Sequence, residues 1–269
     1  MKKALKYTMF LLASAALFSA CGEKDNDPSD APSGGGSSSA PSKKIKQIEL
    51  DYYGDIWINR YTWDGDNIVE LATVRDGRVE QKSRYEYEGN RISRETETRY
   101  YDGEGGYRET VGKYIYAGSH IERVELTEYM YLEGESQPYE QEYDGTRRYT
   151  WGDGKPVRII DEGRHESITH TYQFEGDNLV KMDVDHGYST TISYDNGKNP
   201  FPLMYQFHWS GVQFDGWSVN NITKMEDSRG TITYDYTYDA DGYPVSAKQT
   251  EVDEEGREWE VTITYTYYE

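Results

Sequence analysis

Acidic side chains are the most numerous candidates for catalysis in this 269-residue chain, which has 49 Asp and Glu residues. Hydrolysis of a glycoside needs two carboxyl groups held about 5 to 10 Å apart. Glu49 and Asp51, like Glu251 and Asp253, are two residues apart and would share one face of a β-strand. With so many acidic residues such spacings arise by chance, and a solvated strand face is the simpler interpretation. The sequence therefore predicts no catalytic residue, and a glycoside hydrolase ranks third among the functions considered.

The motifs that offer metal ligands are also explained by strands and turns. His165 and His170 are five residues apart, which sends their side chains to opposite faces of a regular strand. Residues 64–67 (Asp-Gly-Asp-Asn) and 239–242 (Asp-Ala-Asp-Gly) offer the hard oxygen ligands that Ca²⁺ prefers. Neither continues to a distal bidentate Glu, so we interpret both as hairpin turns. We predict no metal and no cofactor.

Cys21, the single cysteine of the chain, stands where a lipid would be attached. It follows a basic start, an apolar run over residues 9–18, and the small residues Ser19 and Ala20, which is the pattern of an export signal. The apolar run is too short to cross a hydrocarbon core of about 30 Å as a helix. The segment resembles the bacterial lipobox, with Phe18 where Leu is usual. That resemblance implies a diacylglyceryl thioether on Cys21 and attachment to a membrane through it.

Residues 22–42 are rich in Asp, Gly, Ser and Pro, and they lack the apolar surface that would offset their ordering entropy. We expect a flexible tether with a typical reach of about 25 Å. The acidic residues directly after Cys21 resemble the export signal of Bacteroidetes-type surface lipoproteins, which implies an outer-membrane location on the cell surface. The predicted organisation is a signal peptide over 1–20, a lipidated cysteine and linker over 21–42, and one domain over 43–269.

The net charge excludes a nucleic-acid partner. It is −20 for the whole chain, with a pI near 4.7, and becomes −23 once the three lysines of residues 1–20 are removed. A field of this sign repels phosphate backbones and anionic lipid surfaces.

A repeated unit dominates residues 43–269, and its dominant bulky side chain is tyrosine, present 27 times in the chain. The unit is an aromatic residue, any residue, a second aromatic, a turn of Gly, Asp or Asn, and then an aliphatic residue. It occurs at residues 61–70, 85–94, 114–123 and 172–181, and with longer turns at 149–157 and 236–245. Aromatics two apart share a strand face, and the turn residues tolerate the positive φ of tight hairpins. We therefore predict an all-β antiparallel meander of repeated hairpins, forming a twisted or curved sheet that stays open or closes part-way into a barrel.

The repeat resembles the tyrosine-aspartate repeats of Rhs-type proteins, with residues 238–243 (Tyr-Asp-Ala-Asp-Gly-Tyr) as the nearest match. Residues 199–202 (Asn-Pro-Phe-Pro), 217–224 and 234–244 together are similar to a family of Bacteroidetes-type lipoproteins that is known only as a domain of unknown function. Membership would imply an anchored β architecture and would supply no catalytic residue.

Residues 199–221 interrupt the repeat with a concentration of aromatic side chains. Phe207, Trp209, Phe214 and Trp217 are the candidate ligand-binding residues, because irregular insertions often carry binding loops. The favoured alternative is a plug that covers an open sheet edge.

The sequence favours a non-catalytic envelope lipoprotein that serves as a surface-exposed binding or scaffold module, with a glycan or a protein as its ligand. The alternative is a periplasm-facing assembly or chaperone-like lipoprotein that holds an apolar guest in a curved sheet.

Overall fold

The computed structural model describes residues 43–89, 91–101, 106–135, 137–163, 166–185, 187–201 and 218–269. Within them, strands and turns account for the fold, and no helix is long and apolar enough to cross a membrane.

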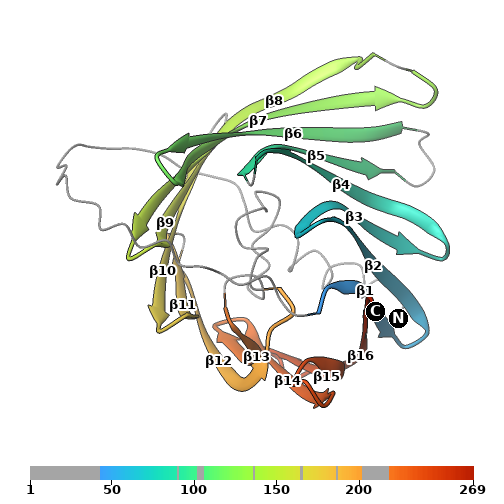
Figure 1. The fold of residues 1–269 in the computed structure, drawn as a ribbon, viewed down its shortest axis with the longest axis vertical. Helices are drawn as coiled ribbons and strands as arrows, with labels where there is room; N and C mark the ends of the chain where they lie inside the picture. The colour runs from blue at the N-terminus through green and yellow to red at the C-terminus, as the bar shows by residue number, and fades with distance from the viewer. Residues whose placement is uncertain are drawn as a thin grey trace.

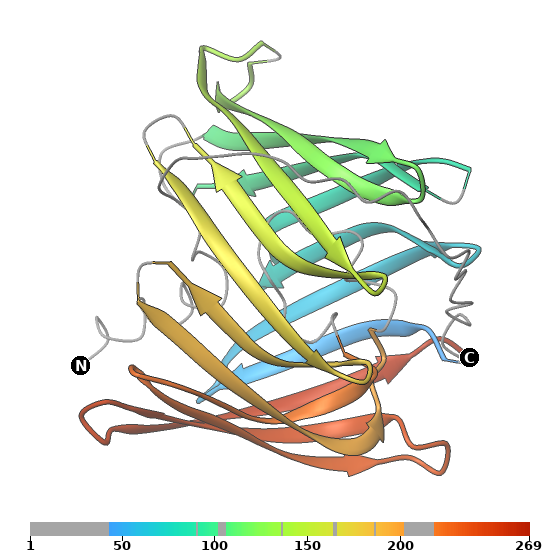
Figure 2. The same ribbon diagram turned by 90° about the vertical axis from the view of Figure 1, so that its left-hand side faces the viewer.

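Sixteen antiparallel strands follow one another around a closed barrel (Figure 1), and the side view shows them inclined across the wall (Figure 2). The strands are β1 Ile45–Tyr52, β2 Asp55–Asp64, β3 Asn67–Arg75, β4 Arg78–Glu88, β5 Arg91–Tyr100, β6 Gly106–Ala117, β7 His120–Leu132, β8 Glu140–Gly152, β9 Lys155–Glu162, β10 Ser167–Glu175, β11 Asn178–Val184, β12 Tyr188–Lys198, β13 Asn220–Asp227, β14 Gly230–Tyr238, β15 Pro244–Asp253 and β16 Glu258–Tyr267. The predicted meander of hairpins is confirmed. Closure is complete rather than partial, because β1 pairs with β16 from Ile45 opposite Tyr267 to Asp51 opposite Thr262.

Each repeat unit is a hairpin whose turn needs a left-handed backbone. The β2–β3 turn has Gly65 at φ +54°, and the β8–β9 turn has Asp153 at +52° followed by Gly154 at +75°. A bulge follows the first aromatic of each unit: the register shifts between Thr62 and Trp63, and it shifts again just before Tyr87, Tyr116, Trp151 and Phe174. Bulges increase the local twist, which helps a sheet curve into a barrel.

The second aromatic of the unit has a specific structural task. Its polar tip donates to a backbone carbonyl near the start of the preceding strand, at a position beyond the last residue pair of the ladder between the two strands. The bonds are Trp63 Nε1 to Ile45 O (2.8 Å), Tyr87 OH to Ile68 O (2.7 Å), Tyr116 OH to Ile92 O (2.9 Å) and Trp151 Nε1 to Ile121 O (2.7 Å). Outside these units, Tyr194 OH on β12 makes an equivalent bond to Leu179 O (2.5 Å). Backbone carbonyls inside a fold need a partner, so Tyr or Trp at this position supplies a donor, whereas Phe174 of the 172–181 unit has none.

The inner face of the barrel is aromatic and aliphatic. One cluster of buried side chains joins Ile45, Tyr61, Tyr85, Val124 and Ile263 from opposite parts of the ring, and a second joins Ile159, Leu179 and Met225. Tyrosines and tryptophans of the repeat units pack against both.

The outer face is charged and hydroxylated. On β16, Thr262, Thr264 and Thr266 alternate with the inward Val261, Ile263 and Tyr265. Ion pairs cross between neighbouring strands on the same face, such as Lys82 with Glu70 (3.1 Å) and Arg148 with Glu162 (2.9 Å). A barrel that spans a membrane has an apolar band outside and a polar interior, so this barrel has the reverse polarity.

Candidate ligand site on the inner wall of the barrel

The predicted ligand-binding residues Phe207, Trp209, Phe214 and Trp217 lie outside the described residues, as do Cys21 and His165. The two ends of the aromatic insertion, residues 199–201 and 218–221, are described.

An asparagine cluster holds the two ends of the insertion together. The Asn199 backbone N–H donates to Val219 O (3.1 Å), and Asn199 Nδ2 donates to Ser218 O (2.8 Å). Asn178 Oδ1, on the neighbouring hairpin, accepts the N–H groups of Val219 and Asn220 at 3.2 Å each. The insertion therefore leaves and rejoins the wall at a fixed point.

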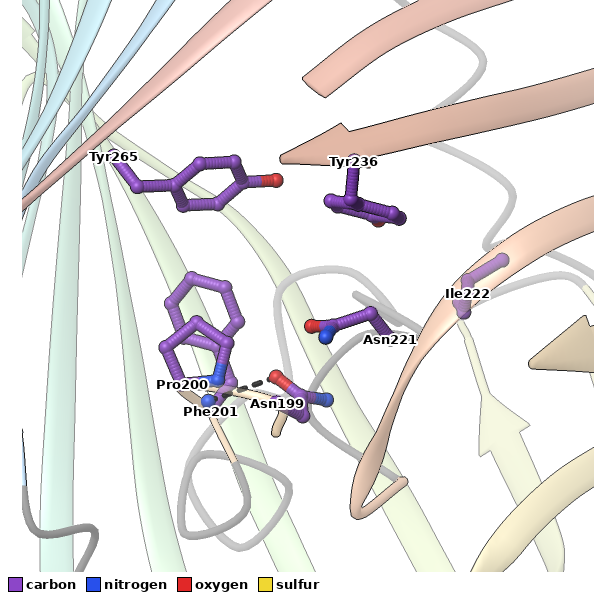
Figure 3. Close-up of a pocket in the computed structure, with 7 residues that line it drawn as sticks. All are labelled: Asn199, Pro200, Phe201, Asn221, Ile222, Tyr236 and Tyr265. Carbon is purple, nitrogen blue, oxygen red and sulfur yellow. Dashed lines mark hydrogen bonds between the residues drawn. The ribbon is translucent and has the colours of Figure 1, made fainter. Parts of the chain in front are cut away.

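Phe201 extends from this point into the barrel. It is 6% exposed, and its ring lies 5.8 Å from that of Tyr61 on β2. The cavity beside it is lined by Asn199, Pro200, Phe201, Asn221, Ile222, Tyr236 and Tyr265, which approach from the insertion and from β13, β14 and β16 (Figure 3). It is about the size of one water molecule, so this cavity is too small for an organic ligand.

A buried polar cluster lies on the inner wall formed by β8, β9 and β10. Arg147 and Asp161 stand directly opposite each other in the ladder and make a bidentate ion pair, in which Arg147 Nη2 donates to Asp161 Oδ2 at 2.7 Å. His170 Nε2 lies 3.5 Å from the same Oδ2. The three residues are 4%, 7% and 2% exposed, respectively.

The electrostatics of this cluster are set by the ion pair. Burial acts to raise the pKa of Asp161, but the charge of Arg147, the neighbouring His170 side chain and the hydrogen bonds from Arg147 outweigh burial and lower that pKa to about 2. Asp161 in turn holds the guanidinium of Arg147 charged, with its pKa above the usual value in spite of burial. At neutral pH the pair is ionised and carries no net charge.

Glu95 extends the polar cluster onto β5. It is fully buried, and Tyr114 OH on β6 donates to Glu95 Oε2 at 2.8 Å. Burial raises the pKa of Tyr114 well above its usual value, so this hydroxyl remains a donor. Gly112 stands opposite Glu95, and Gly145 on β8 stands opposite Leu126 in the same rung, so the wall carries no side chain at these two positions.

Two buried residues, His170 and Glu97, carry atoms that make no hydrogen bond within the described part of the chain. Neither ring nitrogen of His170 makes a hydrogen bond within the described part of the chain, and neither does Glu97 Oε2. Glu97 Oε1 accepts from Arg99 Nε at 2.5 Å. Buried polar atoms are nearly always paired in folded proteins, so these atoms are exceptions in the wall.

The sequence interpretation missed Arg147, Asp161 and Glu95, although a signal was present. Counting back in twos from Trp151 through Tyr149 reaches Arg147, and counting forward from Ile159 reaches Asp161. A charged residue in phase with inward aromatics is the signature of a buried polar site.

One member of each acidic pair considered for hydrolysis, Asp253 and Asp51, has a structural role in a turn. Burial, followed by the charge of Asp253, raises the pKa of Glu251, whereas Asp253 accepts from the N–H groups of Glu255 and Arg257 (2.9 Å each) and pairs with the Arg257 guanidinium. Asp253 thus holds the β15–β16 turn, and Asp51 Oδ1 likewise accepts from Gly54 N (2.6 Å) in the β1–β2 turn.

The two turns considered as calcium sites, residues 64–67 and 239–242, are hairpin connections. Asp66 pairs with Lys44 (2.9 Å), and Lys43 bridges Asp239 (2.6 Å) and Asp241 (2.7 Å). No group of three or more His, Cys, Asp or Glu side chains suited to a metal ion occurs among the residues that the structure describes.

No protein-family model matches this chain, and no curated protein is similar to it in sequence. Two solved structures are similar in fold. A porin-like protein from Bacteroides uniformis has a TM-score of 0.48 and 15% identity, covering 83% of this chain and 96% of its own. A porin-like protein from Bacteroides vulgatus has a TM-score of 0.44 and 9% identity, covering 84% of this chain and 99% of its own.

Proposed function

We propose that this protein is a non-catalytic lipoprotein of the cell envelope that binds a ligand with the inner wall of its barrel. In this proposal Cys21 carries the lipid, residues 22–42 form the tether, and residues 43–269 form the binding domain. The observation that carries the proposal is the polarity of the barrel, with charged side chains outside and aromatic side chains inside.

The outer face argues for a barrel that stands in water. Hydrocarbon around it would bury pairs such as Lys82 with Glu70, and desolvation of such charges costs several kcal/mol per ion. A barrel of this kind needs a separate attachment to stay at a membrane, which is what a lipid on Cys21 would supply. One or more acyl chains anchor a protein through about 0.8 kcal/mol per buried CH₂.

The inner face argues for binding rather than catalysis. It combines aromatic rings with a few buried polar groups, which is the usual composition of a ligand site. One member of each acidic pair weighed for acid–base chemistry, Asp51 or Asp253, is engaged in a turn.

We propose display on the outer face of the outer membrane, as the acidic residues after Cys21 and the likeness to Bacteroidetes-type lipoproteins imply. A periplasm-facing lipoprotein that holds an apolar guest is the second candidate, and the aromatic inner wall favours it equally. Location separates the two.

Protease shaving of intact cells tests location, with a periplasmic protein as the marker. The expected result is loss of the barrel domain from whole cells while the marker survives. Protection until the outer membrane is broken would reject surface display in favour of the periplasmic candidate. The Cys21→Ala variant is expected to lose incorporation of a labelled fatty acid and to leave the membrane fraction; a variant that stays there would refute the anchor.

A further inference from the structure

We propose that one arc of the barrel's outer rim rests in the headgroup region of the membrane that holds the lipid anchor. The arc lies at the end of the barrel opposite to the entry of the chain at Lys43, where odd-numbered strands end and even-numbered strands begin. The inference rests on the proposed function, because the lipid on Cys21 keeps the barrel at the membrane. Six outward side chains from β2, β4, β5, β6 and β7 form what we call the distal arc: Ile56, Ile58, Val79, Tyr100, Tyr107 and Tyr131.

The aliphatic part of the distal arc lies on the outer wall of β2 and β4. Ile58 stands opposite Val74 in the ladder, and Val74 stands opposite Val79, so the three side chains share one face. This is the outer face, because Ile58 is three residues from the inward Tyr61 on a regular stretch of β2. Ile56 shares the face of Ile58, and it is 39% exposed, as Val79 is 38% exposed.

The aromatic part of the distal arc is a row of three tyrosines across β5, β6 and β7. Tyr107 is seven residues from the inward Tyr114 on a regular stretch of β6, so its side chain points outward. Tyr100 and Tyr131 stand opposite Tyr107 on either side, with ring centroids 6.0 and 4.5 Å from its own. The row presents ring edges and hydroxyl groups to its surroundings.

The turns at this end of the barrel continue the asymmetry. Tyr53 in the β1–β2 turn is exposed, and so are Leu132 and Tyr139 on either side of the β7–β8 turn. Beyond the distal arc, exposed acidic side chains occupy the same end: Glu166 before β10, and Glu254 between β15 and β16. One side of the rim is therefore aromatic and aliphatic, and the other side is charged.

A flat layer of lipid headgroups fits an arc of this shape. A cylinder that tilts onto a plane touches it along part of its rim, and the distal arc follows neighbouring strands from β2 to β7. Tyrosine is enriched at membrane–water interfaces, where its ring is covered and its hydroxyl stays wet.

A protein partner fits the arc less well, because a specific interface covers about 800 Å² on each partner. The distal arc is a narrow stripe. The outer wall next to it carries the ion pair of Lys82 with Glu70 (3.1 Å), and Thr98 stands opposite Lys82 in the ladder.

The charge of the protein determines which headgroups suit the arc. The whole chain carries −20, a field that repels an anionic lipid surface. Glu109 lies two residues from Tyr107 on the same face of β6, so an anionic headgroup beside the tyrosine row would meet a carboxylate. We therefore expect the arc to rest on zwitterionic headgroups.

The tether makes a weak contact sufficient. Lys43 is fixed at the opposite end of the barrel, where its ammonium group bridges Asp239 (2.6 Å) and Asp241 (2.7 Å). The eight residues of β1 separate the two ends by about 26 Å, which matches the reach of about 25 Å expected for residues 22–42. A tilted barrel therefore brings the arc to the surface, and a short tether holds it there at an effective concentration of about 1 mM.

Spin labels on the lipidated protein test the contact. Cys21 is the only cysteine of the chain and is blocked by its lipid in the proposed function, so an introduced cysteine is a unique labelling site. Val79→Cys and Tyr107→Cys place labels on the distal arc. Thr191→Cys is the matched control, because Thr191 is exposed near the same end of the barrel on β12, outside the arc.

The readout is the ratio of collisions of each label with oxygen, which partitions into lipid, to collisions with a water-soluble nickel complex. In phosphatidylcholine vesicles we expect this ratio to be roughly fivefold higher at positions 79 and 107 than at 191, since side chains at the interface exclude water. Adding phosphatidylglycerol to the vesicles is expected to lower the ratio at the arc.

Equal ratios at the arc and at position 191 would overturn the inference. So would magnetic coupling between labels at position 79 of two copies, which would assign the arc to a dimer. A ratio at the arc that rises with phosphatidylglycerol would overturn the choice of zwitterionic headgroups.

The outcomes also separate this inference from the proposed function. A protein that incorporates labelled fatty acid while both arc labels stay in water rejects the arc and leaves the anchor. The same arc labels on a Cys21→Ala background, measured with excess phosphatidylcholine vesicles, test the arc alone. If wild type incorporates no fatty acid and these labels still report lipid, the anchor fails and the arc stands.

Discussion

Replacement of Arg147 by Leu should be among the most destabilising changes on the inner wall. The Asp161 side chain is only 9% exposed, and the Arg147 guanidinium donates a hydrogen bond to each of its two carboxylate oxygens. Breaking a buried ion pair by removing one partner costs about 3 to 5 kcal/mol, because the other charge stays buried without its counter-ion. Removing both charges together is far less costly, so the double variant Arg147→Leu/Asp161→Leu should be at least 2 kcal/mol more stable than Arg147→Leu by the same estimate.

The lowered pKa of Asp161 also predicts the direction in which the stability of the protein changes with pH. The pKa of Asp161 is about 2 in the folded protein against an ordinary 3.8, and at about 1.4 kcal/mol per pKa unit this contributes about 2 kcal/mol of stability. A lowered folded pKa means that the contribution is present above pH 4 and is lost as pH falls towards 2. Without Arg147, burial alone would raise the pKa of Asp161, so the variant should lose less stability in acid. The stability gap between wild type and Arg147→Leu should therefore narrow as pH falls from 5 to 3.

Urea denaturation followed by tyrosine fluorescence measures these differences at each pH, because urea leaves ionic interactions unscreened. Arg148→Leu is the matched control: it lies one residue away, on the outer face, with its side chain 50% exposed and paired to Glu162. We expect it to cost less than about 1 kcal/mol. The reasoning would be refuted if Arg147→Leu lowered the free energy of unfolding no more than Arg148→Leu does. It would also be refuted if the stability gap between wild type and Arg147→Leu widened in acid.

Three further changes have definite expected results in the same urea assay or by hydrogen exchange. Tyr116→Phe should cost about 1 kcal/mol, since it removes the donor to Ile92 O and leaves that carbonyl without this bond; no loss would mean that the repeated aromatic is needed only for packing. Gly154→Ala should cost about 1 kcal/mol through backbone strain alone, because φ is +75° and nothing lies within 4 Å of the added Cβ. Asn199→Ala should speed amide exchange at Phe201, whose N–H donates to Asn199 Oδ1 at 2.8 Å, while exchange at Val261 on β16 stays the same.

The hairpins were predictable because the information is local. An aromatic at every second position and a Gly, Asp or Asn turn specify a strand, its two faces and its return within about ten residues, as at Tyr61 and Trp63. The same pattern shows why Tyr and Trp recur, once the carbonyl of Ile45 or Ile68 is seen to need a donor.

Closure of the barrel and the polar cluster were harder to predict from the sequence, because both depend on contacts between residues that are distant in the chain. Nothing in the sequence near Ile45 marks it as the partner of Tyr267. The same local sequence pattern is therefore expected for an open sheet and for a closed barrel. Arg147 and Asp161 become neighbours through the β8–β9 register, and Glu95 joins them through β6 and β7. The aromatic insertion contributed candidate residues that lie outside the described residues, whereas the described wall contributes a site that the sequence interpretation left out.

The seam between β1 and β16 determines when the barrel can be completed during synthesis and export. The first strand pairs with the last, so every earlier strand can find its sequential neighbour while β1 still waits for residues 258–267. A translocating chain therefore exposes two unpaired edges, on β1 and on its most recent strand, until its last strand emerges, and non-local pairing of this kind slows folding. A product that stops before Glu258 would retain two free edges, which are templates for aggregation, and would be a substrate for envelope proteases.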